Sequence, residues 1–217
     1  MRTTAKPRPE RRSQAERSAT TREALLDATI ACLVEDGYAN TTTSRVCERA
    51  GLSRGAHLHH FQTRQALLAA AMEHLAERRG TALLAAAEKL PEGPERLAAG
   101  LDLLWAGYAN PLYQAALDLW THARTDPDLR ERLEPVERDL DRQTLRLSST
   151  LFGERAEQPG FGQLIEMAHA TMRGLALLDT LHPGGGRNRR QWPDCRARLV
   201  EMFDRSANAQ PEEKRDR

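Results

Sequence analysis

The pattern that most constrains this chain is a helical repeat of apolar residues, interrupted at intervals by glycine and proline. Ala and Leu dominate the segments between these breakers, and aromatic residues make up only 5% of the chain. No stretch alternates apolar and polar residues as a half-buried strand does. The pattern therefore predicts an all-α fold of about nine helices.

Capping and breaking residues set the expected ends of these helices. Gly37 is expected to end the first helix, Thr63 to cap the fourth, and Pro135 to kink or interrupt the seventh. In chain order, the expected helices span residues 22–35, 43–50, 54–60, 64–89, 94–109, 111–125, 127–151, 161–182 and 191–206.

Charge is distributed unevenly, although the formal net charge is only +1. Residues 1–64 carry 11 basic and 7 acidic side chains, so the remainder of the chain is mildly acidic. A basic N-terminal third is typical of a nucleic-acid-binding module that is joined to a second domain. The first 17 residues hold six of the basic side chains and two prolines, and we expect a disordered tail there.

Several protein classes are not expected. The chain has neither an apolar run long enough to span a membrane nor the apolar core of a signal peptide. Its three cysteines are far apart in the sequence, which favours reduced thiols in a cytoplasmic protein. Cys32 and Cys47 lie on apolar faces, where core packing is the first interpretation and redox sensing the second. No catalytic motif or cofactor-binding fingerprint is present, so neither an enzyme nor a bound cofactor is expected.

Residues 43–60 are expected to form two short helices joined by a glycine-containing turn, which is the size and arrangement of a helix-turn-helix. Apolar side chains at Val46, Ala50, Leu52 and Phe61 allow its two helices to pack on each other and on the first helix. The remaining positions carry short polar and basic side chains, which suit the major groove of DNA, while free N–H groups at helix starts suit phosphates.

Residues 22–72 also contain a series of short motifs that follow one another in a fixed order without a gap. They are Gly37-Tyr38, Thr41-Thr42, Val46, Ala50-Gly51-Leu52-Ser53, Gly55-Ala56, His59-His60-Phe61 and Leu67-Leu68. This stretch, 51 of 217 residues, closely resembles the DNA-binding domain of the TetR family of transcriptional regulators.

The resemblance implies a set of DNA-contacting residues. Arg54, at the start of the recognition helix, is expected to pair with a guanine, which is worth roughly 1–3 kcal/mol of discrimination. Most of the others are expected to contact the phosphates or the groove. The full set is Thr42, Thr43, Ser44, Arg45, Ser53, Arg54, Gly55, His59, His60 and Arg64.

The chain departs from the family pattern at one place. His57-Leu58 stands where most members have Leu-Tyr, so a tyrosine that commonly contacts phosphate is missing. Leu58 has two interpretations, contact with a thymine methyl group or burial in the core. His57 is either exposed or packed beside Phe61. The three histidines 57, 59 and 60 are not expected to bind a metal, since no further ligand completes a set.

The resemblance also implies the overall organisation and the partners. We expect a basic tail over residues 1–17, a DNA-binding domain over 18–63, a helical ligand-binding and dimerisation domain over 64–206, and a second disordered tail over 207–217. The expected partners are a palindromic double-stranded DNA operator, a second copy of the chain and a small-molecule effector that causes release of the operator. The segment 161–182 is apolar nearly all round, so it and residues 191–206 are expected to form the dimer interface.

Aromatic residues cluster in the middle of the chain, where an all-α effector domain would place its cavity. Core packing is the competing interpretation for each of them, and His169 is a candidate polar anchor. The few charges in these segments predict an uncharged or weakly charged hydrophobic effector. The expected pocket residues are Leu101, Trp105, Tyr108, Tyr113, Leu117, Trp120, Met167 and Thr171.

Two other functions compete with a ligand-responsive repressor. A non-catalytic helical adaptor would use the helix-turn-helix for protein contacts, and an enzyme would need an unfamiliar all-α site. The basic tail has two interpretations as well, a solubilising end or an arm that adds contacts to DNA.

Overall fold

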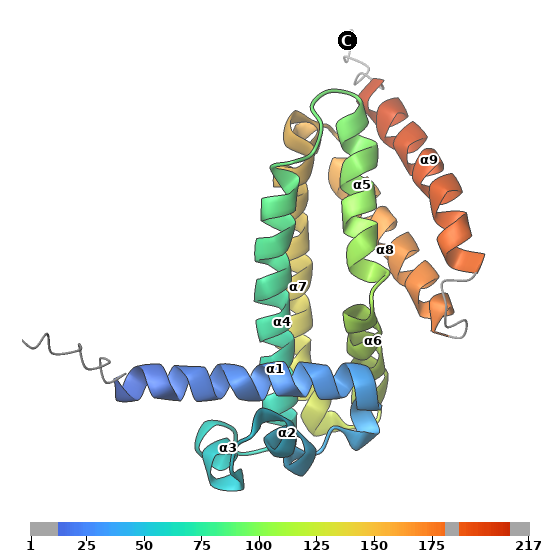
Figure 1. Cartoon of the computed structure of the whole chain (residues 1–217). Coiled ribbons are helices and arrows are strands. Elements are labelled where there is room, and N and C mark those ends of the chain that lie inside the picture. Colours follow the sequence, from blue (N-terminus) through green and yellow to red (C-terminus); the bar gives the residue numbers. More distant parts are fainter. Residues whose placement is uncertain (1–12, 181–186, 209–217) are drawn as a thin grey trace, which may run out of the picture.

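The computed structural model describes residues 13–180 and 187–208, and every regular element within these ranges is a helix (Figure 1). An all-α fold is thereby confirmed. The elements are α1 (Gln14–Asn40), α2 (Thr43–Ala50), α3 (Arg54–His60), α4 (Arg64–Ala87), α5 (Glu95–Tyr108), α6 (Pro111–Ala123), α7 (Pro127–Phe152), the 3₁₀-helix η1 (Gly153–Glu157), α8 (Phe161–Asp179) and α9 (Arg187–Asn208).

Helix α1 begins well before the expected start near residue 22. The hydroxyl of Ser13 accepts a hydrogen bond from the Glu16 amide (3.1 Å), and the Glu16 carboxylate accepts one from the Ser13 amide (2.7 Å). This reciprocal capping box nucleates the helix at Gln14. Residues 13–17 therefore form the cap and first turn of a helix rather than part of a tail, and residues 1–12 of that expected tail lie outside the described residues.

The C-terminal part of α1 is interrupted at Gly37, as the sequence predicts, but one more short turn of helix follows. Gly37 has φ 73° and ψ 174°, a conformation that is essentially restricted to glycine. The break frees the amide of Tyr38 from the helical hydrogen-bond pattern. That amide donates instead to the carboxylate of Asp118 in α6 (2.8 Å).

The other helix boundaries follow the breakers closely, with differences in α7 and α9. Helix α7 continues through Pro135, where a kink or an interruption is expected from the sequence. At its start, the Asp126 carboxylate accepts a hydrogen bond from the Leu129 amide (3.0 Å) and so caps the first turn. At the other end of the chain, α9 extends to Asn208, so residues 207–208 are helical rather than part of the second tail.

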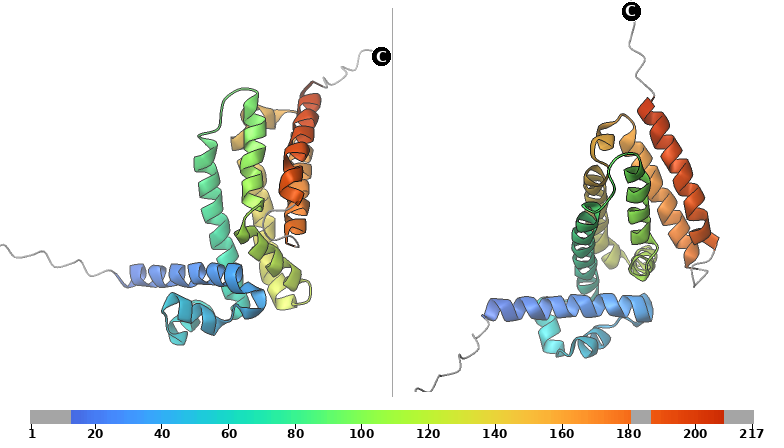
Figure 2. Two further views of the ribbon diagram at one scale, coloured as in Figure 1. Left: turned by 45° about the vertical axis from the view of Figure 1, so that its right-hand side comes forward. Right: turned by 45° about the horizontal axis from the view of Figure 1, so that its top comes forward.

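The helices form two parts on either side of α1. In Figure 1, α1 runs across the base of the molecule with α2 and α3 below it, and most of the length of the remaining helices lies above it. Helices α4 and α7 lie side by side along most of their length, and α8 and α9 form a pair on one flank (Figure 2). Leu25, Leu26 and Val46 are fully buried in the core of the lower part, and Leu101 and Met172 in that of the upper part.

Candidate functional site

Helices α2 and α3 are held by local caps and a shared apolar core. The Thr42 hydroxyl accepts a hydrogen bond from the Arg45 amide at the start of α2, and the Ser53 hydroxyl accepts one from the Ala56 amide at the start of α3, both at 3.2 Å. Val46 and Phe61 are buried and pack against α1 and α4. The result is a helix-turn-helix whose second helix projects from the end of the molecule.

The outer face of α3 carries both a cation and an apolar side chain. Arg54, Gly55 and His59 are exposed, and Leu58 is 61% exposed. Of the two interpretations of Leu58, burial in the core is therefore wrong. An exposed leucine beside a basic residue gives this helix an apolar contact point on the surface where base edges would lie.

His57 occupies the opposite, buried face of α3. It is only 3% exposed, and its ring centroid lies 6.3 Å from that of Phe61. Burial, together with the nearby positive charge of Arg54, lowers the pKa of His57 from its usual value. The ring is therefore a neutral core group, as in the second interpretation from the sequence.

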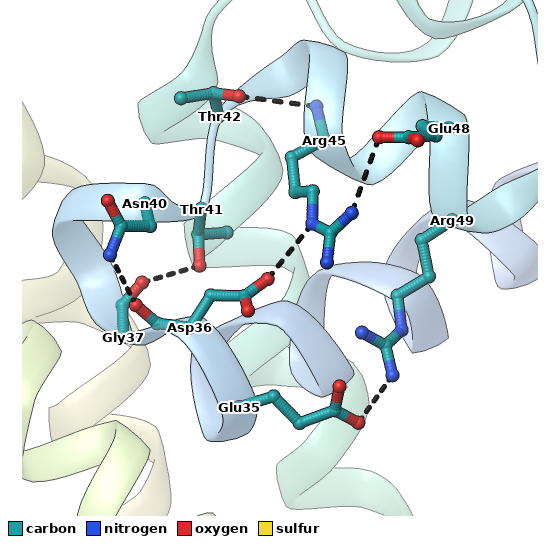
Figure 3. A network of polar contacts seen from close by, with 9 residues as sticks. All are labelled: Glu35, Asp36, Gly37, Asn40, Thr41, Thr42, Arg45, Glu48 and Arg49. Atoms are coloured by element: carbon teal, nitrogen blue, oxygen red, sulfur yellow. Dashed lines mark hydrogen bonds and ion pairs between the residues drawn. The ribbon is translucent and has the colours of Figure 1, made fainter.

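Arg45 belongs to a network of polar contacts within the lower part of the molecule (Figure 3). Its guanidinium pairs with Asp36 of α1 (3.1 Å) and with Glu48 of α2 (3.3 Å). Arg49 pairs with Glu35 beside it. Arg45 remains about half exposed, so the network holds a cation at the surface rather than burying it.

Arg64 faces inward. Its Nε donates to the carbonyl of Thr41 (2.8 Å), another guanidinium nitrogen donates to the carbonyl of Tyr38, and its Cζ lies 4.1 Å from the centre of the Tyr38 ring. The same tyrosine ring stacks on His122 of α6 (4.2 Å), and its hydroxyl donates to Asp126 (3.2 Å). Arg64 and Tyr38 thus join the helix-turn-helix to α4, α6 and the start of α7.

The remaining expected contact residues lie close to these helix starts. Thr42, Ser44 and Ser53 are exposed, while Thr43 and His60 are partly exposed. The structure therefore collects the expected residues on α2, α3 and their preceding turns, with Arg64 set apart by its internal hydrogen bonds. Contact of each residue with DNA stays a prediction.

A second candidate site is a cavity of about 690 Å³ in the upper part of the molecule. Its walls come from α1, α4, α5, α6, α7 and α8. Its volume lies within the range of pockets that enclose small molecules. Three of the expected pocket residues, Tyr108, Tyr113 and Trp120, line it, and so does His169, the candidate anchor.

The other expected pocket residues do not line this cavity. Trp105 is buried and stacks on Trp192 of α9 (5.1 Å between ring centroids), while Met167 lies on the outer surface. Helical periodicity identifies an apolar face but does not distinguish a packed core from a cavity wall, which explains the difference. The five residues outside the cavity lining are Leu101, Trp105, Leu117, Met167 and Thr171.

The sequence interpretation missed the contributions of α1 and the cations. Ile30 and Val34 bring α1 into the cavity wall, and Arg79 and Arg173 bring positive charge into it. An arginine on an amphipathic helix normally indicates a solvent face, and only tertiary contacts reveal otherwise.

One face of α8 carries exposed apolar and small residues. Leu177 is 52% exposed, and Leu178 and Met167 are exposed as well. Ala170 and Gly174 lie between them and are also exposed. A contiguous apolar strip of this kind is unusual on the surface of a monomer. Leu181, part of the expected apolar helix, lies outside the described residues.

Comparisons with known proteins fit this geometry. The family model of the bacterial regulatory proteins of the tetR family matches residues 25–71. The regulator BetI of Burkholderia cenocepacia is 31% identical over 160 residues, which cover 72% of this chain and 77% of BetI. The chain belongs to the TetR family.

Two further comparisons give a similar relative and a shared fold. The regulator CymR of Pseudomonas putida is 37% identical over 132 residues, which cover 60% of this chain and 65% of CymR, slightly less than two thirds. A transcriptional regulator from Rhodococcus sp. Rha1 shares the fold, with a TM-score of 0.66 and 24% identity over 88% of this chain and 99% of that one. These TetR-family relatives are regulators, not enzymes.

Two negative observations complete the description of this TetR-family chain. Within residues 13–180 and 187–208, no His, Cys, Asp and Glu side chains gather in a group able to hold a metal ion. In the same ranges, no helix is long and apolar enough to cross a membrane.

Proposed function

We propose that this protein is a transcriptional repressor of the bacterial cytoplasm, which binds a palindromic DNA operator as a homodimer and releases it when a small molecule occupies the cavity. The observation that carries the proposal is the pairing of an exposed recognition helix with a cavity that shares α1 and α4 with it. Family membership supports the DNA-binding part. The cavity supports the ligand-responsive part.

Direct reading of the operator is assigned to α3. Arg54 is exposed at the first position of this helix, where its guanidinium is able to reach a guanine edge. Leu58, one turn later, is placed to contact a thymine methyl group, in place of the tyrosine common in the family. Thr42 and Ser53 lie at helix N-termini, which favour phosphate.

The dimer is assigned to the exposed strip on α8 together with the adjacent α9. Pairing two such faces in a four-helix arrangement would bury Leu177, Leu178 and Met167. Two recognition helices would then meet successive turns of the major groove, about 34–36 Å apart.

Release follows from the shared walls of the cavity. Helix α4 has 24 residues, roughly 36 Å at 1.5 Å per residue, and extends from the helix-turn-helix to the cavity. Ile30 and Val34 of α1 also face the cavity, so a ligand there would contact the DNA-binding part directly. A ligand that fits better when α1 and α4 are tilted would favour the separation that does not match the operator.

The test is the substitution Arg54→Ala, with Arg138→Ala on the exposed surface of α7 as the matched control. Binding-site selection on random DNA should show a relaxed base preference at one position in each half-site for Arg54→Ala and an unchanged site for the control. An unchanged preference in Arg54→Ala would remove this residue from direct readout.

The salt dependence of binding separates a repressor from a helical adaptor. Operator affinity should fall steeply as salt rises from 50 to 200 mM, because released counterions drive association with DNA. Retention of proteins but not of any selected DNA would favour the adaptor.

A further inference from the structure

Arg79 is partly buried, and its guanidinium lies against α5 in the upper part of the molecule. A Cβ atom on Gly107 would lie only 2.8 Å from the Arg79 Cζ and would overlap one of its terminal nitrogens. The Cζ also lies 5.2 Å from the centre of the Tyr108 ring. Gly107 therefore makes room for the cation, and Tyr108 supplies an aromatic face beside it.

The other charged groups of the cavity wall have partners. Asp27 pairs with Arg78 (2.7 Å), and Glu35 pairs with Arg49. Arg173 pairs with Glu137 at 3.9 Å. Among the described residues, no carboxylate forms an ion pair or a hydrogen bond with Arg79, and the positive charge of Arg173 lowers its pKa further.

A cation that loses its hydration without gaining an anionic partner lowers the stability of the folded protein. Burial lowers the pKa of Arg79, yet an arginine remains protonated at neutral pH. Its planar fork of N–H donors matches a carboxylate in shape as well as in charge. The cavity thus offers a built position for an anionic group, since the carboxylates of its wall, Asp27 and Glu35, pair with other arginines.

The surroundings of Arg79 describe the rest of the ligand. The Tyr108 hydroxyl and the Nδ1 atom of His169 are hydrogen-bonded at 2.7 Å, which fixes two polar groups at this end of the cavity. Apolar side chains make up most of the other walls, among them Ile30, Leu83 and Leu147. Arg78 and Arg173 of the wall already pair with Asp27 and Glu137, so the charge of Arg79 alone is left for a ligand. One such charge fits a monoanion better than a phosphate ester, which carries nearly two charges.

We propose that the effector of this protein is a carboxylate carried on a hydrophobic body, and that its carboxylate pairs with Arg79. The proposal rests on the ligand-responsive function given above and defines its ligand class. It narrows the uncharged or weakly charged hydrophobic effector expected from the sequence to an anion.

Calorimetric titration of the full-length protein with two matched series tests the ligand class. Decanoate and 2-naphthoate serve as the carboxylates, with decanamide and 2-naphthamide as neutral equivalents and decylamine and 2-naphthylmethylamine as cationic ones. At least one carboxylate should bind ten-fold or more tightly than its amide, and the amines should not bind. Equal binding of acid and amide, or no binding of either carboxylate, would overturn the proposal.

The affinities of three variants for the carboxylate test whether its anionic group pairs with Arg79. Arg79→Met should lower the affinity of the bound carboxylate at least ten-fold and leave that of its amide unchanged. Gly107→Ala, which displaces the guanidinium, should act in the same direction. Arg138→Met, on the exposed surface of α7, is the matched control and should bind like the parent. Full carboxylate affinity in Arg79→Met would overturn the assignment of this residue.

Thermal unfolding of the ligand-free protein tests whether the charge of Arg79 lacks an anionic partner in the folded state. Arg79→Met should raise the midpoint of thermal unfolding by a few degrees, because the variant buries no unpaired cation. Arg138→Met should leave it unchanged. A lower midpoint for Arg79→Met would show that the folded protein compensates the charge, which contradicts the proposal.

A gel-shift assay keeps the two proposals distinguishable. Carboxylate binding that leaves a selected operator bound would overturn ligand-induced release but not the anion site. Operator release by the amide or the amine instead of the carboxylate would uphold the repressor and overturn the ligand class.

Discussion

His57 is a polar residue in an apolar environment. Its Nε2 atom is buried and has no hydrogen-bond partner within the described part of the chain, and burial lowers the pKa of the ring. At pH values between this lowered pKa and the ordinary value near 6.5, the unfolded chain binds a proton that the folded chain does not. The free energy of unfolding therefore decreases as the pH falls below about 6.5.

We predict that His57→Leu stabilises the protein by about 1 kcal/mol at pH 7.5, because the unsatisfied nitrogen is removed. The advantage should increase at pH 5.5, since the variant also lacks the group that takes up the proton. Denaturant unfolding at the two pH values measures both effects. His59→Gln, at an exposed position on the same helix, is the control and should change neither. A pH dependence in His57→Leu equal to that of the parent would contradict the prediction.

The cysteines give a second prediction for single residues. Burial raises the pKa of the Cys32 and Cys47 thiols, so little of the reactive thiolate form exists at either position at pH 7 to 8. Cys195 is partly exposed. N-ethylmaleimide should therefore modify Cys195 alone in the native protein and all three in denaturant, as read by mass spectrometry. Native modification of Cys32 at the rate of Cys195 would contradict their burial.

At the scale of single helices, the sequence predicted most where the determinants are local. The bounds of α2 and α3 agree with the sequence interpretation because Thr42 and Ser53 cap each helix within three residues. The capping box at Ser13 is just as local, but it precedes a polar stretch without apolar periodicity and was missed. Arg79 had no local signal at all, since its burial depends on Gly107, which lies in another helix.

The interruption of α1 gives a prediction at this scale. Gly37→Ala should destabilise the protein by about 1–3 kcal/mol, because alanine is strained at φ 73° and ψ 174°. Gly162→Ala in α8, where a Cβ would meet no atom within 4 Å, should be neutral or slightly stabilising. Denaturant unfolding of the two variants makes the comparison. Equal stabilities would show that the break in α1 does not depend on glycine.

At the scale of the whole molecule, the exposed strip on α8 determines the expected assembly. We predict that Leu177→Arg together with Leu178→Arg yields a monomer by light scattering at micromolar concentration, because charges would be buried between the subunits. Operator affinity should fall strongly as well, since a single recognition helix remains per particle. Leu84→Arg, at an exposed leucine on α4, is the control and should leave a dimer. A parent protein that is monomeric would contradict this assignment.

The bond between the Tyr38 amide and Asp118 has a consequence for how the molecule opens. The donor belongs to the helix that carries the helix-turn-helix, and the acceptor to a helix that lines the cavity. Deuterium can replace the hydrogen of this amide only when the two parts separate or the chain unfolds locally. The exchange rate of this amide thus measures motion between the DNA-reading part and the ligand-binding part, and the measurement needs neither DNA nor an attached probe.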